Sequence, residues 1–208
     1  MNTVNYSSGK NADTSVPVNT LIQRRWSPRA FDPNRNIPHE TLLSILEAAR
    51  WSASAANAQP WSFIVAPRDN QAEFQKLLGI LKEGNQTWAQ HAAVLLLGVI
   101  AKYRREDVLN RHAPHDLGMA MGYMVLQALE HDIYAHMIGG FYGDLARDAY
   151  AIPDEYEPFT AIAFGYKTED LSRLTENHQR SEHATRQRKP LEDFIFNGTW
   201  AQTADFLR

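Results

Sequence analysis

The sequence contains no cysteine, and this absence removes a broad set of chemistries. Disulfides, zinc–thiolate sites, iron–sulfur clusters and thiol nucleophiles all require cysteine sulfur. Long hydrophobic runs are also missing: the longest, residues 92–101, is about half the length that a membrane span needs. The chain has no internal repeat and no glycine-rich dinucleotide fingerprint. A nicotinamide donor, if one is used, would therefore bind transiently and outside a Rossmann cleft.

A strong charge of either sign is absent as well. The chain has 21 basic and 24 acidic residues, for a formal net charge of −3, which gives no electrostatic basis for binding nucleic acid or an anionic membrane. Its 208 residues suffice for one domain with a core of its own. Residues 1–19 are polar and lack the apolar centre of a signal peptide. We therefore expect a flexible arm over 1–19, a single domain over 20–208 and a cytoplasmic location.

Hydrophobic periodicity indicates both helices and strands. It predicts a helix from Pro38 with Leu42, Leu43, Leu46 and Ala49 on one face. Further helices are expected from Asn70 to about Lys82 and, buried on all sides, from Asp116 to about His131. Short apolar runs predict strands near residues 61–66, 93–100, 134–138 and 160–165.

Polar groups and small residues fill residues 51–60, between a predicted helix and a predicted strand. Small side chains let a flat ligand approach closely, while Ser54, Asn57 and Gln59 supply donors and acceptors. Pro60 favours an extended conformation at Gln59 and so fixes the start of the strand. On composition alone, the same stretch also describes an ordinary polar loop.

Three other segments carry residues suited to binding. Arg24, Arg25 and Arg29 surround a helix end beside Ser27, and guanidinium groups suit phosphate or carboxylate recognition, although a solvated basic face has the same composition. A glycine pair, residues 139–140, follows a predicted strand and permits positive φ and close approach to a ligand. The histidines near residues 112–116 invite a metal interpretation, but Pro114 and the lack of a third suitably spaced ligand argue against one.

The motif Ser-x-x-Asn-x-Gln-Pro-Trp-x-Phe at residues 54–63 resembles that of the FMN-dependent nitroreductase family. Further segments between Leu21 and Trp200 resemble the family in the same order: Arg-x-Ser-x-Arg-x-Phe at 25–31, Asn85, Ile-x-Gly-Phe at 138–141, Gly-Tyr at 165–166 and Arg-x-Arg-x-Pro-Leu at 186–191. The expected fold is nitroreductase-like α+β, with a mixed, mainly antiparallel central sheet flanked by helices. The resemblance also implies a homodimer with a domain-swapped C-terminal tail.

The resemblance implies specific roles for site residues. The first basic residue and the serine of the 25–31 motif would face the flavin phosphate and ribityl chain, and Arg29 would stabilise the anionic N1/O2 edge of reduced flavin. Two arginines of the 186–191 motif would complete the phosphate clamp. The full set of implied cofactor-binding residues is Arg25, Trp26, Ser27, Arg29, Ala53, Ser54, Ala55, Asn57, Asn85, Ile138, Gly139, Gly140, Arg186 and Arg188.

The implied activity is electron transfer from NAD(P)H through FMN to nitroaromatics, quinones or similar electron-poor acceptors by a ping-pong mechanism. The flavin would carry the chemistry, so no protein residue is expected to act as a nucleophile or a general acid. Departures from the family pattern at Trp26, Ala53, Trp88 and Gly139 leave the pocket shape open. The alternatives are a flavin protein that stores or fragments FMN, one that reduces enones or halogenated aromatics, and a basic interaction module without flavin. The physiological acceptor, the choice between NADH and NADPH, and the roles of the arm and of residues 102–115 stay open.

Overall fold

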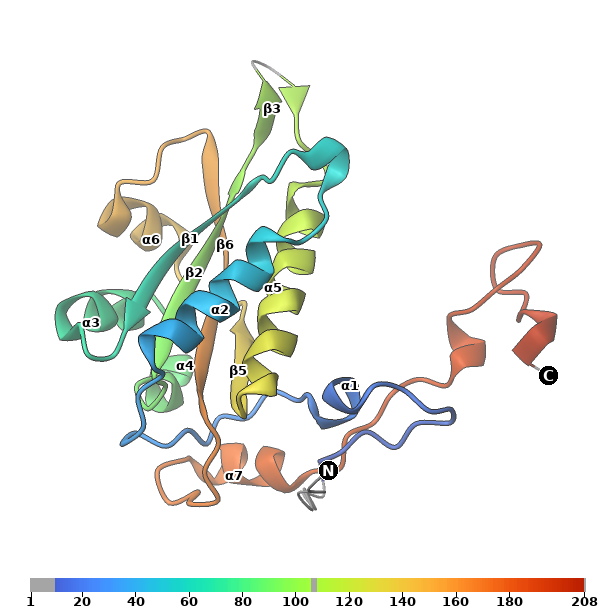
Figure 1. Ribbon diagram of the computed structural model, residues 1–208, viewed down its shortest axis with the longest axis horizontal. Coiled ribbons are helices and arrows are strands. Elements are labelled where there is room, and N and C mark those ends of the chain that lie inside the picture. The colour runs from blue at the N-terminus through green and yellow to red at the C-terminus, as the bar shows by residue number, and fades with distance from the viewer. Residues whose placement is uncertain (1–9, 106–107, 208) are drawn as a thin grey trace.

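The computed structural model describes residues 10–105 and 108–207 and contains a four-stranded sheet (Figure 1). Part of the predicted arm, residues 1–9, lies outside the described residues. The strands are β1 (Trp61–Pro67), β2 (Val94–Ala101), β5 (Ile133–Ile138) and β6 (Tyr156–Tyr166). They lie in the order β1-β2-β6-β5, and each neighbouring pair is antiparallel. All four predicted strands are confirmed.

Helices cover both faces of the sheet, so its central strand β2 is apolar throughout. Side chains alternate between the two faces of a strand. Val94 and Leu96 therefore pack with α2 (His39–Arg50) and α5 (Ala113–Glu130). Leu95 and Leu97 pack with α3 (Gln71–Gly79), α4 (Glu83–Ala89) and α6 (Gly143–Tyr150). Figure 1 shows these two helical layers with the sheet between them, which confirms the predicted α+β fold.

Gly98 lets α5 lie close against the sheet. A Cβ atom at this position would stand 2.7 Å from Cε of Met121 and 3.2 Å from Cδ1 of Leu117. The β2–β6 register also shifts between Gly98 and Val99. Glycine within a strand commonly marks a bulge or a close approach of another element, and here it marks both. The position of α5 matters because this helix borders the candidate site.

Three helices lie where none was predicted: α6 and two that adjoin the site. The helix expected to reach Lys82 ends at Gly79, since Lys82 adopts an extended conformation (φ −64°, ψ 147°) and its N–H donates to the Gly140 carbonyl. The chain then forms α4, which places Asn85 in a helix rather than in a loop. The second of these two helices is α7 (Glu176–His183), capped by the Thr175 hydroxyl. A short hairpin of β3 (Tyr103–Arg105) and β4 (Val108–Leu109) borders the undescribed residues 106–107.

The predictions for α2 and α5 were right in position but wrong about which faces are buried. On α2 the buried residues include Ile45, whereas Leu43 is 51% exposed. Helix α5 is not buried all round: Met119 and Tyr123 are 37% and 41% exposed and lie beside Gly118 and Gly122 on the same face. A single chain thus leaves one apolar face of α5 uncovered.

The chain ends are the parts of the described structure that pack least on the sheet. Figure 1 shows the C-terminal segment, with 3-10 turns at Leu191–Asp193 and Asp205–Leu207, passing α1 (Thr20–Arg24) and leaving the body. Its large side chains are exposed: Phe194, Trp200 and Phe206. Within 10–105 and 108–207, no helix has the length and apolar character to cross a bilayer.

Candidate functional site

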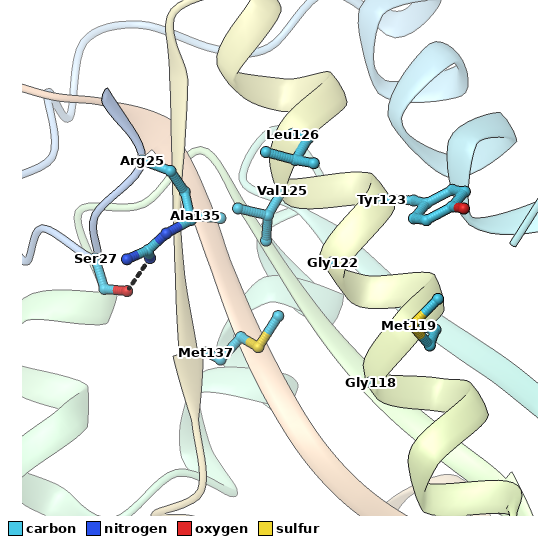
Figure 2. Close-up of a pocket in the computed structure, with 10 residues that line it drawn as sticks. All are labelled: Arg25, Ser27, Gly118, Met119, Gly122, Tyr123, Val125, Leu126, Ala135 and Met137. Carbon is cyan, nitrogen blue, oxygen red and sulfur yellow. Dashed lines mark hydrogen bonds between the residues drawn. The ribbon is translucent and has the colours of Figure 1, made fainter. Parts of the chain in front are cut away.

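Arg25 and Ser27 line a cavity of about 390 Å³ between β5 and α5 (Figure 2). Asn19 caps α1, and the chain turns extended at Arg25, so the two side chains project beside β5. Nη1 of Arg25 donates to the Ser27 hydroxyl at 3.4 Å. On the opposite wall, Gly118 and Gly122 contribute no side chain, and Met137 lies between the two walls. The cavity is therefore apolar on one side and cationic on the other.

Three arginines from opposite ends of the chain converge at this cationic side. The pKa of Arg25 is lowered by burial and then by the charge of Arg188. Burial also lowers the pKa of Arg186, followed by the charges of Arg25 and Arg188. Within the described residues, no acidic side chain forms an ion pair with any of the three. Like charges held together without a counter-charge create a positive potential that attracts anions.

Arg29 lies on the other side of the same loop, above the ring of Trp88. Its backbone N–H donates to Oε1 of Glu182 at 2.9 Å, and its guanidinium carbon lies 5.9 Å from the Trp88 ring centre. Nε of Arg29 is buried and lacks a partner among the described residues. Buried donors in native proteins are normally paired, so an unpaired one here indicates a missing acceptor.

His136 packs against Trp88 with ring centres 4.5 Å apart, and Nδ1 lies 3.0 Å from the Pro28 carbonyl oxygen. Burial lowers its pKa to about 4, with a smaller lowering from Arg29 and an opposing effect of the Pro28 hydrogen bond. His136 is therefore neutral at physiological pH, which leaves Arg29 as the cation at this end of the site.

The Gly139–Gly140 turn follows β5 as predicted, but glycine is needed there for a reason other than the positive φ that was expected. Neither residue has a positive φ. At Gly140 a Cβ atom would lie 2.5 Å from Nδ2 of Asn85, which donates to the Gly140 carbonyl at 2.9 Å. At Gly139 nothing lies within 4 Å of a Cβ position, so the backbone there faces open space. The Ile138 side chain is buried in the core, so only its backbone can face a ligand.

The loop after α2 is held in an unusual conformation. Three residues that are not glycine have positive φ: Ala56, Asn57 and Gln59. The extended conformation expected at Gln59 before Pro60 is therefore wrong. The Ser54 hydroxyl accepts a hydrogen bond from the Gln59 N–H at 3.0 Å, and Asp116 accepts one from the Ala55 N–H at 3.2 Å. Left-handed backbone in non-glycine residues is costly and clusters at binding sites. This loop leaves the Asn57 side chain exposed.

A second cavity, of about 180 Å³, lies beside this loop at the start of α5 and is lined by Ala53, Ser54, Ala55, His112, His115, Asp116 and Met119. Met119 also lines the first cavity. The two cavities therefore adjoin along α5, the smaller at its first turns and the larger further along the helix. One chain thus divides the predicted site residues between two places. In the described ranges, no three His, Asp or Glu side chains are grouped to hold a metal.

Trp26 is buried and does not line the first cavity. Its ring meets Tyr134 edge-on and lies 4.9 Å from Nζ of Lys10. Nothing in the sequence indicated Lys10 or Glu182. Lys10 lies against Trp26, and Glu182 on α7 accepts a hydrogen bond from the Arg29 N–H. The Thr175 cap could have indicated α7. No sequence pattern could have placed Lys10, because its partners are backbone carbonyls.

Comparison with known proteins places residues 22–166 in the family described as Nitroreductase family. A solved structure described as an oxidoreductase containing FMN has 34% identity and a TM-score of 0.84, over 91% of this chain and 96% of that one. An "Uncharacterized 15.4 kDa protein in ask 5'region" of Mycolicibacterium smegmatis is 32% identical over 66% of this chain and 96% of its own length. The "Major NAD(P)H-flavin oxidoreductase" of Aliivibrio fischeri is 40% identical, over 26% of this chain and 24% of its own length.

Proposed function

The chain belongs to the nitroreductase family, and on that premise we propose that it is an FMN-dependent oxidoreductase. It takes electrons from NAD(P)H and delivers them to electron-poor small molecules such as nitroaromatics or quinones. The FMN named for the solved relative and the NAD(P)H–flavin activity named for the Aliivibrio fischeri relative support this proposal. The observation that carries it is the group of three arginines without a counter-charge beside an apolar cavity.

The residues present fit the phosphate of FMN. Phosphate is a doubly charged acceptor, and guanidinium groups can bind it through two parallel hydrogen bonds. Arg25, Arg186 and Arg188 supply the charge, and the Ser27 hydroxyl beside Arg25 can add a neutral donor. Arg25 and Arg186 are partly buried, which strengthens their contacts because screening by water is reduced, whereas Arg188 is exposed.

The residues present also fit the flavin ring. Bound FMN supplies the transfer of an electron pair, which no side chain of a chain without cysteine provides in this fold. The unpaired Nε of Arg29 is a donor for the oxygen edge of the ring, and its charge favours the anionic reduced form. The backbone at Gly139, with open space beside it, leaves room for the ring on that side. We place Asn85 behind this turn, where it fixes the Gly140 carbonyl.

The complete site is proposed to form between two copies of the chain. Arg25, Ser27 and Arg29 of one protomer, with Asn85 behind its Gly139–Gly140 turn, would face the Ser54–Asn57 loop of its partner. The division of the predicted residues between two cavities supports this arrangement, as does the uncovered apolar face of α5. The aromatic C-terminal segment would then pack on the partner in a domain swap. Its exposed Trp200 supports that placement.

Turnover is expected to be ping-pong. One face of one flavin would serve both the donor and the acceptor, so they would occupy it in succession. Steady-state rates measured with NAD(P)H and a nitroarene should give parallel lines in double-reciprocal plots. Intersecting lines together with a demonstrable ternary complex would contradict this mechanism. A protein that binds FMN but sustains no NAD(P)H oxidation with any nitroarene or quinone would instead be a flavin-storing or flavin-fragmenting member of the fold.

A further inference from the structure

Residues 10–12 lie against the segment that carries two of the arginines. Nζ of Lys10 donates to the carbonyl oxygen of Ser181 at 2.9 Å and to that of Ala184. In return, Nη1 of Arg186 donates at 2.9 Å to the carbonyl oxygen of Lys10 and at 2.9 Å to that of Gln23. The Ala12 N–H donates to the same Gln23 carbonyl at 2.9 Å. These bonds tie three segments together that are far apart in sequence.

The position of Lys10 is unusual for a lysine, because only 9% of the residue is exposed. Burial lowers the pKa of Lys10, the charge of Glu182 opposes that shift, and the charge of Arg186 adds to it. A buried ammonium group is tolerated only where acceptors replace its water. Here two carbonyls at the C-terminal end of α7 do so, and the negative end of the helix dipole favours the cation.

The Lys10 side chain holds the chain at residues 181 and 184, just before Arg186 and Arg188. Residue 184 leaves α7 in an extended conformation, and the next residues have no place in the sheet or in a helix. Without an anchor, this segment would have to be ordered each time an anion binds, which costs affinity. Because Lys10 binds the carbonyl oxygens of residues 181 and 184, the backbone that leads to the two arginines is already fixed before an anion binds.

We propose that Lys10 is a positioning residue for the anion site: it anchors residues 181–186 so that Arg186 and Arg188 meet Arg25 around one phosphate. This inference rests on the proposed binding of FMN. Lys10 lies upstream of the family match at residues 22–166, so it is a feature of this chain rather than of the matched segment. Its effect should depend on the phosphate of the ligand and not on the flavin ring.

The test is fluorescence titration of the FMN-free full-length protein with FMN and, separately, with riboflavin, which lacks the phosphate. Lys10→Met should raise the Kd for FMN by about tenfold, since it removes two charge-assisted hydrogen bonds that fix the clamp. The Kd for riboflavin should stay within twofold of the wild-type value. Lys10→Arg, which can still donate to both carbonyls, should restore most of the FMN affinity. Added to the double replacement Arg186→Ala and Arg188→Ala, Lys10→Met should have little further effect.

Lys76→Met is the matched control, because Lys76 on α3 lies over the ring of Tyr150 on α6, away from the site. It should leave both Kd values unchanged. If Lys10→Met is recovered unfolded, Lys10→Gln, which keeps a shorter donor group, carries the same comparison. Equal weakening of both flavins, or unchanged FMN binding in the Lys10 variants, would overturn the role of Lys10 alone. A wild-type protein that binds both flavins equally would instead overturn the phosphate site itself.

Discussion

Replacing Arg25 and Arg186 together with alanine is expected to weaken FMN binding by more than about a hundredfold, and each single replacement by about ten- to a hundredfold. Each guanidinium would contribute charge-assisted hydrogen bonds to the phosphate, and such bonds contribute roughly 1.5–3 kcal/mol. Riboflavin should bind the wild type poorly and should be almost unaffected by either replacement. Equilibrium titrations of the wild type and the three variants with both flavins measure these effects.

Replacement of Arg25 should not destabilise the protein in the absence of flavin. Burial and the charge of Arg188 both lower the pKa of Arg25, so its charge is unfavourable in the unliganded fold. Thermal unfolding of flavin-free Arg25→Ala is therefore expected at or slightly above the wild-type temperature, whereas Arg186→Ala also loses two hydrogen bonds to carbonyl oxygens and should unfold at a lower temperature. Arg180→Ala, at an exposed position on α7, is the control and should alter neither quantity. Equal weakening of both flavins would show that these arginines do not bind phosphate.

Replacing Tyr123 with glutamate is expected to convert a dimer into monomers and to abolish tight FMN binding. Tyr123 is 41% exposed on the uncovered face of α5, near the 37% exposed Met119 and the 42% exposed Met137. An unpaired carboxylate in an apolar interface costs several kcal/mol, which is enough to shift a dimer of ordinary affinity. FMN would be lost because the Ser54–Asn57 loop of the partner would no longer close the site.

Sedimentation velocity of the wild type and the Tyr123→Glu variant measures this change directly. Leu145→Glu is the matched control, because Leu145 is 47% exposed on α6, on the other side of the sheet. The control should remain dimeric and retain FMN. A wild-type protein that sediments only as a monomer while it holds FMN tightly would contradict the two-chain site.

The sheet and helix α2 could be predicted because their signal is local. The short apolar run in β1 and the continuous apolar sequence in β2 follow from burial of these strands between helices. The interruption of the helix near Lys82 could not be predicted in this way. The Lys82 N–H donates to the Gly140 carbonyl, and no local sequence pattern encodes that distant contact. Helix α7 was missed because it is almost entirely polar and is held by contacts from Lys10 and Arg29.

The site was predicted unevenly for similar reasons. Arg25 and Arg188 could be placed together only through the resemblance to a family, because charge repulsion alone would separate them. The need for glycine at residue 140 was expected to come from backbone conformation, whereas it comes from the nearby Asn85 amide. The exposed face of α5 could not be distinguished from a buried one, since Met119 and Tyr123 have the same hydrophobic signal in an interface as in a core.

The central claim is that this chain binds FMN and uses it to oxidise NAD(P)H. The most direct measurement is the visible absorbance spectrum of the purified protein, recorded before and after anaerobic addition of NADPH or NADH and again after addition of a nitroarene. We expect a flavin spectrum with one FMN per chain, its loss with the nicotinamide and its return with the acceptor. A colourless protein that acquires no flavin spectrum after incubation with excess FMN and gel filtration would contradict the claim.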